Sequence, residues 1–194
     1  MKPDNMKTNV LFIQGAGNGA YEEDKKLAES LRNSLNAGFE VHYPAMKDEA
    51  DADYHTWAAQ IREESALLDG PLIFVGHSVG ASVLIKFFSE TETPKTIRGI
   101  FLMAAPFWGG EGGWTYEGYE TLALPDESAC KLSKDVPVFF YHSRDDETVP
   151  FAHLALYAKR LPNATIHARE GGGHQLNNDL SGVADDIKRL FSAP

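Results

Sequence analysis

Six short runs rich in β-branched, aromatic and aliphatic residues alternate with segments of helical period along the whole chain. We expect strands at Val10–Ile13, Glu40–Tyr43, Leu72–Val75, Ile97–Met103, Val136–Tyr141 and Thr165–His167. The third run is apolar at every position, which is typical of a parallel strand covered on both faces. Strands that alternate with helices favour right-handed βαβ units. The pattern therefore predicts one α/β domain over residues 1–194, with about six parallel strands, helices on both faces and a minimal cap.

The charge balance excludes several classes of partner. The 194 residues include 18 basic and 28 acidic side chains, for a net charge of −10. Such a field repels phosphate backbones and anionic lipid surfaces, so we expect neither nucleic acid nor membrane as a partner. Cys130 is the only cysteine, so no disulfide forms within the chain. The polar start of the sequence does not resemble a signal peptide, and we expect a cytoplasmic protein.

A G-x-S-x-G motif stands between the third expected strand and a helical run that begins at Ala81. The motif is Gly76-His77-Ser78-Val79-Gly80. A serine on such a tight strand-to-helix turn presents its hydroxyl at the carboxyl end of the strand, and the flanking glycines leave room for the backbone to bend. The amide of Val79 then lies at the helix N-terminus, where it can stabilise a developing oxyanion. Ser78 is therefore the candidate nucleophile.

A nucleophilic serine needs a general base and a carboxylate that orients it. Of the seven histidines, only His174 lies in a glycine loop, after the last strand and before the final helix. The fifth strand runs into two adjacent aspartates, Asp145 and Asp146, and either could serve as the acid. Serine, aspartate and histidine then follow one another in the chain order of α/β-hydrolases.

With these motifs, the chain resembles the α/β-hydrolase superfamily of serine hydrolases over Val10 to Phe191. It is similar to small members with little lid, including the retinoblastoma-binding-protein-like serine hydrolases and the dienelactone-hydrolase-like esterases. The resemblance implies that the acid is Asp146, three residues before the valine of Val149-Pro150, and that Asp145 shapes the turn. It also implies a second oxyanion donor at the amide of Ala16, just after the first strand.

The chain departs from these relatives at two positions. Gln14 stands where a histidine often precedes the oxyanion loop, but the donor is a backbone amide and is retained. Dienelactone hydrolases use a cysteine nucleophile, whereas this motif carries Ser78, which argues against a dienelactone substrate.

The same glycine loop also fits the G-x-G-x-x-A fingerprint of dinucleotide-binding proteins, at Gly15, Gly17 and Ala20. Three carboxylates at 22–24 stand where a pyrophosphate would bind, which argues against this alternative. The acidic run 48–53 similarly predicts a solvated helix start rather than a metal site.

A stretch of about thirty residues, 104–135, interrupts the alternation where α/β-hydrolases insert lids. It is broken by glycines and contains no long amphipathic helix. Its aromatic side chains Trp108, Trp114 and Tyr116 either line a substrate pocket or close one end of the core.

The sequence therefore predicts a serine esterase that cleaves a small carboxylic ester or thioester through an acyl-enzyme. This chemistry needs no metal or organic cofactor. Two alternatives remain open. One is a protein of this fold that binds a ligand or partner without turnover, and the other is an acyltransferase that uses the same three residues.

Overall fold

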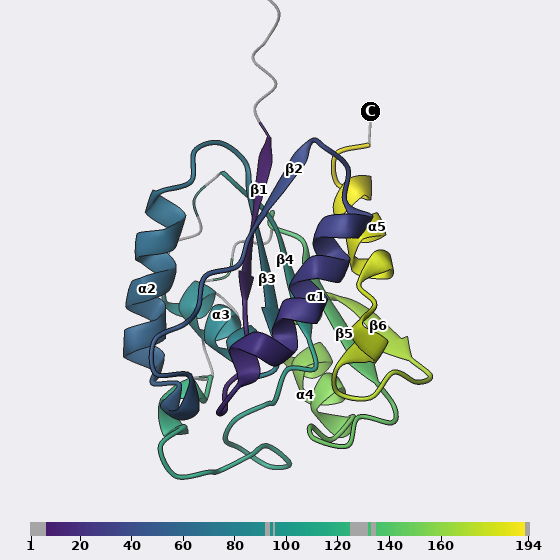
Figure 1. The fold of residues 1–194 in the computed structure, drawn as a ribbon. Coiled ribbons are helices and arrows are strands. Elements are labelled where there is room, and N and C mark those ends of the chain that lie inside the picture. The colour runs from purple at the N-terminus through teal and green to yellow at the C-terminus, as the bar shows by residue number, and fades with distance from the viewer. Residues whose placement is uncertain (1–6, 92–93, 95, 125–131, 133–134, 193–194) are drawn as a thin grey trace, which may run out of the picture.

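The central sheet has six parallel strands in the order β2-β1-β3-β4-β5-β6 (Figure 1). The computed structural model describes residues 7–91, 94, 96–124, 132 and 135–192. The strands are Thr8–Ile13 (β1), Phe39–His42 (β2), Leu72–His77 (β3), Ile97–Met103 (β4), Val138–Ser143 (β5) and Thr165–Arg169 (β6). Within the described residues the α-helices are Ala20–Ser34 (α1), Tyr54–Ala66 (α2), Val79–Glu90 (α3), Ala152–Arg160 (α4) and Ser181–Arg189 (α5). The predicted single α/β domain with helices on both faces is confirmed.

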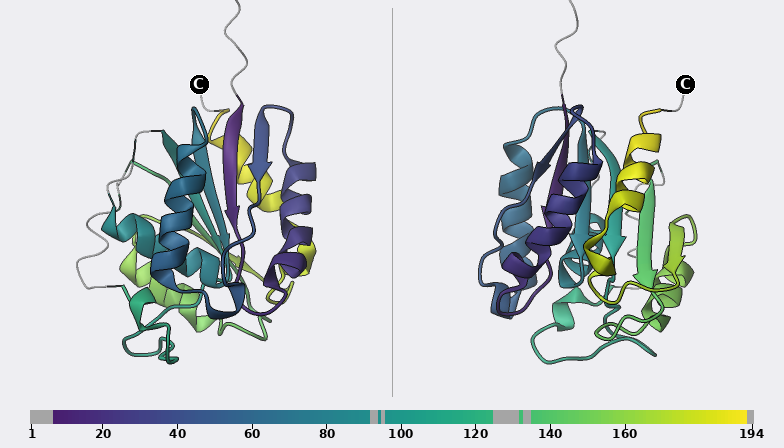
Figure 2. Two further views of the ribbon diagram at one scale, coloured as in Figure 1. Left: turned by 60° about the vertical axis from the view of Figure 1, so that its left-hand side comes forward. Right: turned by 45° about the vertical axis from the view of Figure 1, so that its right-hand side comes forward.

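Each face of the sheet has its own hydrophobic core. Helices α2, α3 and α4 cover one face, and α1 and α5 lie side by side over the other (Figures 1 and 2). Alternate residues of one strand enter different cores, so Leu11 packs with the first group of helices and Val10 with the second. Both residues are fully buried. This two-sided burial explains why residues 10–13 of β1, 72–75 of β3 and 100–103 of β4 are apolar at every position.

The strand order reverses between β1 and β3. The chain leaves β1 for β2 on one side and later continues from β3 to β6 on the other. In open α/β sheets, ligands bind outside the carboxyl ends of the strands at such a switch point. The loop after β1 and the turn after β3 meet there, at the lower edge of the sheet in Figure 1.

The stretch between β4 and β5 forms a compact loop rather than a lid in its described part. An isolated bridge pairs Trp108 with Trp114, and a single turn of 3-10 helix spans Glu120–Leu122. The lone cysteine, Cys130, lies outside the described residues. No helix in the described part of the chain combines the length and apolar composition needed to cross a bilayer.

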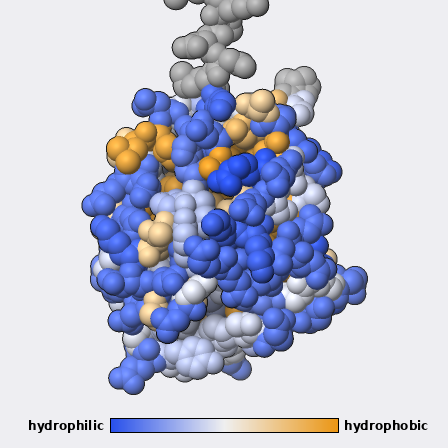
Figure 3. All heavy atoms as spheres, in the orientation of Figure 1, coloured by the Kyte–Doolittle hydropathy of each residue, from blue (hydrophilic) through white to orange (hydrophobic). Residues whose placement is uncertain are grey.

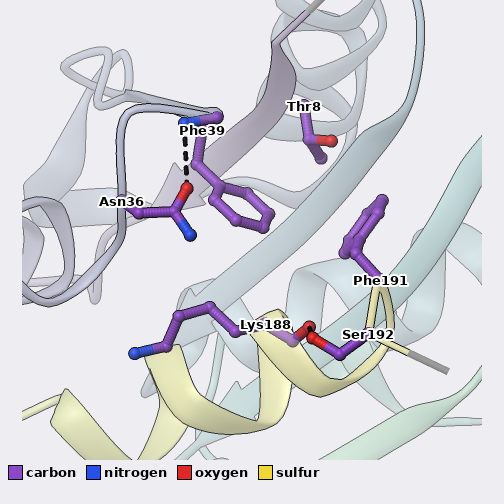
Figure 4. Close-up of a pocket in the computed structure, with 7 residues that line it drawn as sticks. Thr8, Asn36, Phe39, Lys188, Phe191 and Ser192 are labelled. Carbon is purple, nitrogen blue, oxygen red and sulfur yellow. Dashed lines mark hydrogen bonds between the residues drawn. The ribbon is translucent and has the colours of Figure 1, made fainter.

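The surface around α1 is largely hydrophilic (Figure 3), as the excess of acidic residues leads one to expect. At the end of the sheet away from the switch point, a cavity of about 270 Å³ lies between the start of β1 and the end of α5 (Figure 4). The side chains of Asn36, Phe39 and Lys188 line it. It contains no carboxylate or imidazole that could catalyse acyl transfer.

Candidate active site

Ser78 lies on a strained turn between β3 and α3. Its backbone has φ 51° and ψ −125°, a conformation that L-residues rarely adopt. Its own amide donates to the Met103 carbonyl at 2.9 Å, which ties the turn to the end of β4. The serine is only partly buried. This geometry matches the predicted nucleophile turn, in which the side chain is pushed out from the sheet edge.

The two glycines of the motif are required by close packing. A Cβ on Gly76 would lie 2.8 Å from Ala81 Cα in the first turn of α3. A Cβ on Gly80 would lie 2.7 Å from the Ile13 carbonyl oxygen and would also overlap the Gln14 carbonyl. Only glycine therefore allows α3 to begin directly against the end of β1. That contact brings the loop after β1 next to the nucleophile.

Two backbone amides beside Ser78 have no hydrogen-bond acceptor among the described residues. They are the amides of Ala16, in the loop after β1, and Val79, the first residue of α3. Neighbouring loop amides are paired, because Gly15 donates to Asp24 at 2.7 Å and Gly17 donates to the Glu49 carbonyl at 2.7 Å. The two free amides are the two that the sequence predicts for an oxyanion hole.

Glu49 holds the loop after β1 in place. Its carboxylate accepts from the amides of Gly19 and Tyr21 at 2.8 Å each, and from Gln14 Nε2 at 2.9 Å. These hydrogen bonds lower the pKa of the Glu49 carboxyl. The carboxylate thus occupies the N-terminus of α1, where a pyrophosphate would have to bind. This arrangement argues further against the dinucleotide alternative.

The acidic run 48–53 also starts a helix, as expected. Asp53 is the N-cap of α2, and its carboxylate accepts from the Thr56 amide at 2.8 Å. The hydrogen bonds from Thr56 lower the pKa of the Asp53 carboxyl.

Asp146, in the turn after β5, is paired with His174. Its Oδ2 accepts from His174 Nδ1 at 3.0 Å and from His142 Nε2 at 3.1 Å. Its Oδ1 accepts from the amides of Thr148 and Val149 at 2.9 and 2.8 Å. Burial opposes ionisation, but the hydrogen bonds from His142 and His174 hold the pKa of this carboxyl well below its usual value. Asp146 is therefore an ionised, fully buried carboxylate that fixes one ring nitrogen of His174.

The two acids that flank Asp146 hold the loop that carries His174. Asp145 accepts from the amides of Gly172 and Gly173 at 3.3 and 2.9 Å. Glu147 accepts from the His174 amide at 3.2 Å. The two glycine amides lower the pKa of the Asp145 carboxyl. Asp145 thus makes no contact with the His174 ring. It shapes the glycine loop before His174, whereas the resemblance implied that it shapes its own turn after β5.

His174 and Ser78 lie on adjacent segments without a hydrogen bond between their side chains. The His174 ring lies 4.7 Å from the ring of His77, the residue before the serine. With Nδ1 held by Asp146, Nε2 is the nitrogen left to exchange a proton. Within the described residues Ser78 Oγ has no hydrogen-bond partner. Catalytic hydrogen bonds of this kind often close only when substrate binds.

The aromatic residues expected either to line a pocket or to close one end of the core pack mainly against one another. Trp108 is 5% exposed and belongs to the core on the α3 side. Its ring lies 5.5 Å from Trp114, which in turn lies 5.1 Å from the largely exposed Tyr116. A cavity of about 380 Å³ is lined by Trp108, Glu111 and Lys159, but not by Trp114 or Tyr116. Trp108 therefore closes the core and borders a cavity at the same time.

Sequence reasoning missed several residues of this site, including Asp24, Glu49, His142 and Glu147. One signal was available for Asp24. It stands one turn before Leu27 and two turns before Leu31, on the buried stripe of α1, where a carboxylate is 1% exposed and must find a partner. The other residues carry no such local signal.

Comparison with known proteins decides the family. The sequence profile of the family described as "Serine hydrolase" matches residues 27–184. This chain belongs to that serine hydrolase family.

Solved structures show the same fold for this serine hydrolase. The ydeN gene product of B. subtilis is 19% identical with a TM-score of 0.71, and the match covers 96% of this chain and 100% of that one. Est1E from Butyrivibrio proteoclasticus, solved with ferulic acid bound, is 15% identical with a TM-score of 0.68 over 97% and 90% of the two chains. The serine hydrolase CCSP0084 of Cycloclasticus zankles is 17% identical with a TM-score of 0.67 over 96% and 90%. A search of curated proteins finds no match for this serine hydrolase.

Proposed function

We propose that this serine hydrolase cleaves a small carboxylic ester or thioester through an acyl-enzyme on Ser78. One observation carries the proposal. An ionised, buried Asp146 holds His174 Nδ1 at 3.0 Å beside a serine at φ 51°, next to two backbone amides without acceptors. These are the nucleophile, the oriented base and the oxyanion donors that acyl transfer requires.

The chemistry follows from these positions. His174 Nε2 takes the proton of Ser78 Oγ as the oxygen attacks the carbonyl carbon of the substrate. The amides of Ala16 and Val79 donate to the oxyanion, and Asp146 stabilises the imidazolium that forms. His174 then donates its proton to the leaving alcohol or thiol. Water repeats the sequence on the acyl-enzyme and releases the acid.

The proposed substrate is small because the described residues between β4 and β5 form no lid helix. The described part of the stretch between β4 and β5 contains one turn of 3-10 helix and an aromatic cluster. Trp108 borders a cavity, Trp114 packs against Trp108, and Tyr116 packs against Trp114. We infer that these aromatic side chains flank the acyl or alcohol group. The similar fold of Est1E, solved with ferulic acid, supports an acid of modest size as the acyl product.

An acyltransferase with the same residues is the second candidate, because an open site admits alcohols and thiols as well as water. Product analysis in the presence of an added alcohol separates the two, since a transferase forms the new ester faster than the free acid. A binding protein without turnover is disfavoured because Asp146 holds His174 Nδ1 at 3.0 Å on the segment beside Ser78, an arrangement that ligand binding alone does not require.

The test uses a fluorophosphonate probe, which forms a covalent bond with an activated serine. We expect one adduct per chain, on the peptide that contains Ser78, and activity on p-nitrophenyl acetate. Ser78→Ala should lose the adduct and at least about 10⁴-fold in kcat/KM. Stoichiometric labelling elsewhere, or an active Ser78→Ala variant, would refute the proposal.

A further inference from the structure

Directly beneath the candidate site lies a second histidine and aspartate pair that the proposed mechanism does not use. His77 Nδ1 lies 2.9 Å from Asp24 Oδ2, and the two side chains are 1% and 2% exposed. His77 is the residue before the nucleophile, and Asp24 belongs to the first turns of α1. A charged pair this deeply buried is expensive to form, so it calls for an explanation.

Both ring nitrogens of His77 face groups that can only accept a hydrogen bond. Nδ1 faces the Asp24 carboxylate, and Nε2 lies 3.0 Å from the backbone carbonyl oxygen of His174. A neutral imidazole has one N–H donor, so it would leave one of these oxygens opposite a lone pair. The geometry therefore requires a ring that carries both protons.

The titratable groups around His77 include Asp24, the His174 ring at 4.7 Å and the more distant Asp146, and the two carboxylates favour the charged form of His77. Burial disfavours the charged form of His77, but Asp24 in α1, the His174 carbonyl and the more distant Asp146 together raise its pKa above the ordinary value. Burial likewise disfavours the ionised form of Asp24, but His77 and the Gly15 amide lower the pKa of this carboxyl. Tyr43, directly after β2, stays neutral because burial and the charge of Asp24 raise its pKa.

The pair joins the segments that carry the candidate site. Asp24 Oδ2 also accepts from the Gly15 amide at 2.7 Å, next to the oxyanion donor Ala16. Asp24 Oδ1 accepts from Gln175 Nε2 at 3.1 Å, next to His174. His77 itself precedes Ser78 and donates to the His174 carbonyl. One buried ion pair thus contacts the oxyanion loop, the nucleophile turn and the base loop.

We propose that His77 is an imidazolium at neutral pH, paired with Asp24, and that the pair is a positioning device that holds Ser78, His174 and the Ala16 loop in register. The inference rests on the function proposed above for those three segments. A neutral His77 would release either Asp24 or the His174 carbonyl, and the loop on that side would lose its anchor. Displacement of a catalytic group by about 1 Å costs on the order of 10²-fold in rate.

The charge can be tested directly in the full-length protein. In ¹⁵N-histidine NMR spectra, both His77 nitrogens should carry protons at pH 7.5, where an ordinary histidine is neutral. The His77→Gln variant identifies the signals by their disappearance. A neutral His77 at pH 7.5 overturns the inference whatever the activity of the protein.

The positioning role is tested by Asp24→Asn, which keeps the shape of the side chain and removes its charge. We expect a folded protein whose His77 is neutral at pH 7.5, with kcat on p-nitrophenyl acetate about 10- to 100-fold lower and KM within about threefold. The rate of Ser78 labelling by fluorophosphonate should fall in parallel.

The matched control is Asp186→Asn. Asp186, in α5, is also a buried carboxylate, and it accepts from Tyr141 Oη at 2.7 Å and lies 3.3 Å from His167 Nε2. It contacts none of the three segments, so its loss should lower stability and leave kcat within about twofold of the wild type. Equal losses of kcat in Asp24→Asn and Asp186→Asn would show that general destabilisation explains the loss of activity, and would overturn the positioning role.

Parallel assays of Ser78→Ala distinguish a failure of the positioning role from a failure of the proposed function. If Ser78→Ala retains ester hydrolysis, the proposed function fails, and with it the positioning role. If Ser78→Ala is inactive while Asp24→Asn keeps the wild-type kcat, the proposed function stands and the positioning role fails alone.

Discussion

Replacing Asp146 with asparagine removes one charge and changes the hydrogen-bonding capacity of a single atom. In the native protein Asp146 Oδ2 accepts from His174 and His142. Oδ1 accepts from the amides of Thr148 and Val149 and also lies 3.1 Å from His174 Nδ1. An asparagine has one acceptor and one donor group in these places. In either orientation of the amide, its NH₂ therefore meets two donors.

The magnitude follows from which pair is lost. If the NH₂ replaces Oδ2, His174 Nδ1 keeps only the oxygen at 3.1 Å and meets the NH₂ donor at 3.0 Å. This favours the tautomer with the proton on Nε2, which is the wrong one to accept from Ser78. In a serine protease this tautomer error costs about 10⁴-fold in kcat, which is about 5.5 kcal/mol of transition-state free energy. If the NH₂ faces the turn instead, two backbone hydrogen bonds are lost, and the free energy of unfolding should fall by about 1–3 kcal/mol.

The assay compares Asp146→Asn with Asp145→Asn, its neighbour in the chain. Both variants lose one carboxylate charge, but Asp145 contacts only the amides of Gly172 and Gly173, and one asparagine oxygen can still accept from Gly173 at 2.9 Å. We expect kcat/KM on p-nitrophenyl acetate to fall about 10³- to 10⁴-fold for Asp146→Asn. The Asp145→Asn loss should stay below about tenfold. Urea unfolding curves establish that both proteins are folded.

Two results would contradict this reasoning. A folded Asp146→Asn protein with more than a tenth of the wild-type activity would show that the His174 tautomer does not depend on this carboxylate. A larger loss for Asp145→Asn than for Asp146→Asn would transfer the orienting role to the loop anchor.

Gly80→Ala should lower the free energy of unfolding by about 1–3 kcal/mol or more and Tm by roughly 5–10 °C, because the new methyl group meets the Ile13 carbonyl oxygen at 2.7 Å; a calorimetric Tm equal to that of the wild type would contradict the packing. Activity on p-nitrophenyl esters should peak between acetate and about hexanoate without interfacial activation, since each methylene gains about 0.8 kcal/mol only while it finds buried surface, and a maximum at dodecanoate or beyond would instead indicate a deep acyl tunnel. The stability advantage of the wild type over Asp24→Asn should depend on pH. Because the pKa of His77 is raised in the folded protein, its contribution to the free energy of unfolding is complete below pH 6.5 and is lost as the pH rises through the folded-state pKa. Because the pKa of Asp24 is lowered, its contribution is complete above pH 3.8 and is lost as the pH falls through the folded-state pKa. Urea unfolding should therefore show its largest difference between about pH 4 and 6.5 and a smaller difference once the pH passes the folded-state value of either group, and a difference that does not vary with pH would mean that the pair is uncharged.

Local patterns in the sequence were enough to predict the six strands, the two-sided sheet and the turn at Ser78. All of these depend on residues close together in the chain, on apolar periodicity and on the conformational needs of glycine. Strand ends were less accurate. The fifth strand was expected at 136–141 and lies at Val138–Ser143, because pairing of His142 and Ser143 with Ala168 and Arg169 of β6 extends it past the apolar run.

The acid partner of His174 could not be decided from the residues alone. Asp145 and Asp146 are adjacent and equally polar, and the choice between them came from the resemblance to a family. In the structure the two carboxylates leave the same turn in different directions, so that one is buried against His174 while the other reaches the glycine amides. Only the path of the folded turn distinguishes them.

The sequence by itself determined the fold and the chemical types of the candidate site, because hydrophobic burial and turn geometry act on neighbouring residues. The tertiary structure decided how that site is held together. Asp24 contacts His77 across 53 residues and Gln175 across 151, and no periodic pattern links positions so far apart. Such hydrogen bonds form only after the sheet has brought the ends of β1, β3 and β6 to one edge, because a buried charge can then find its partners only among the side chains and amides that the fold has placed there.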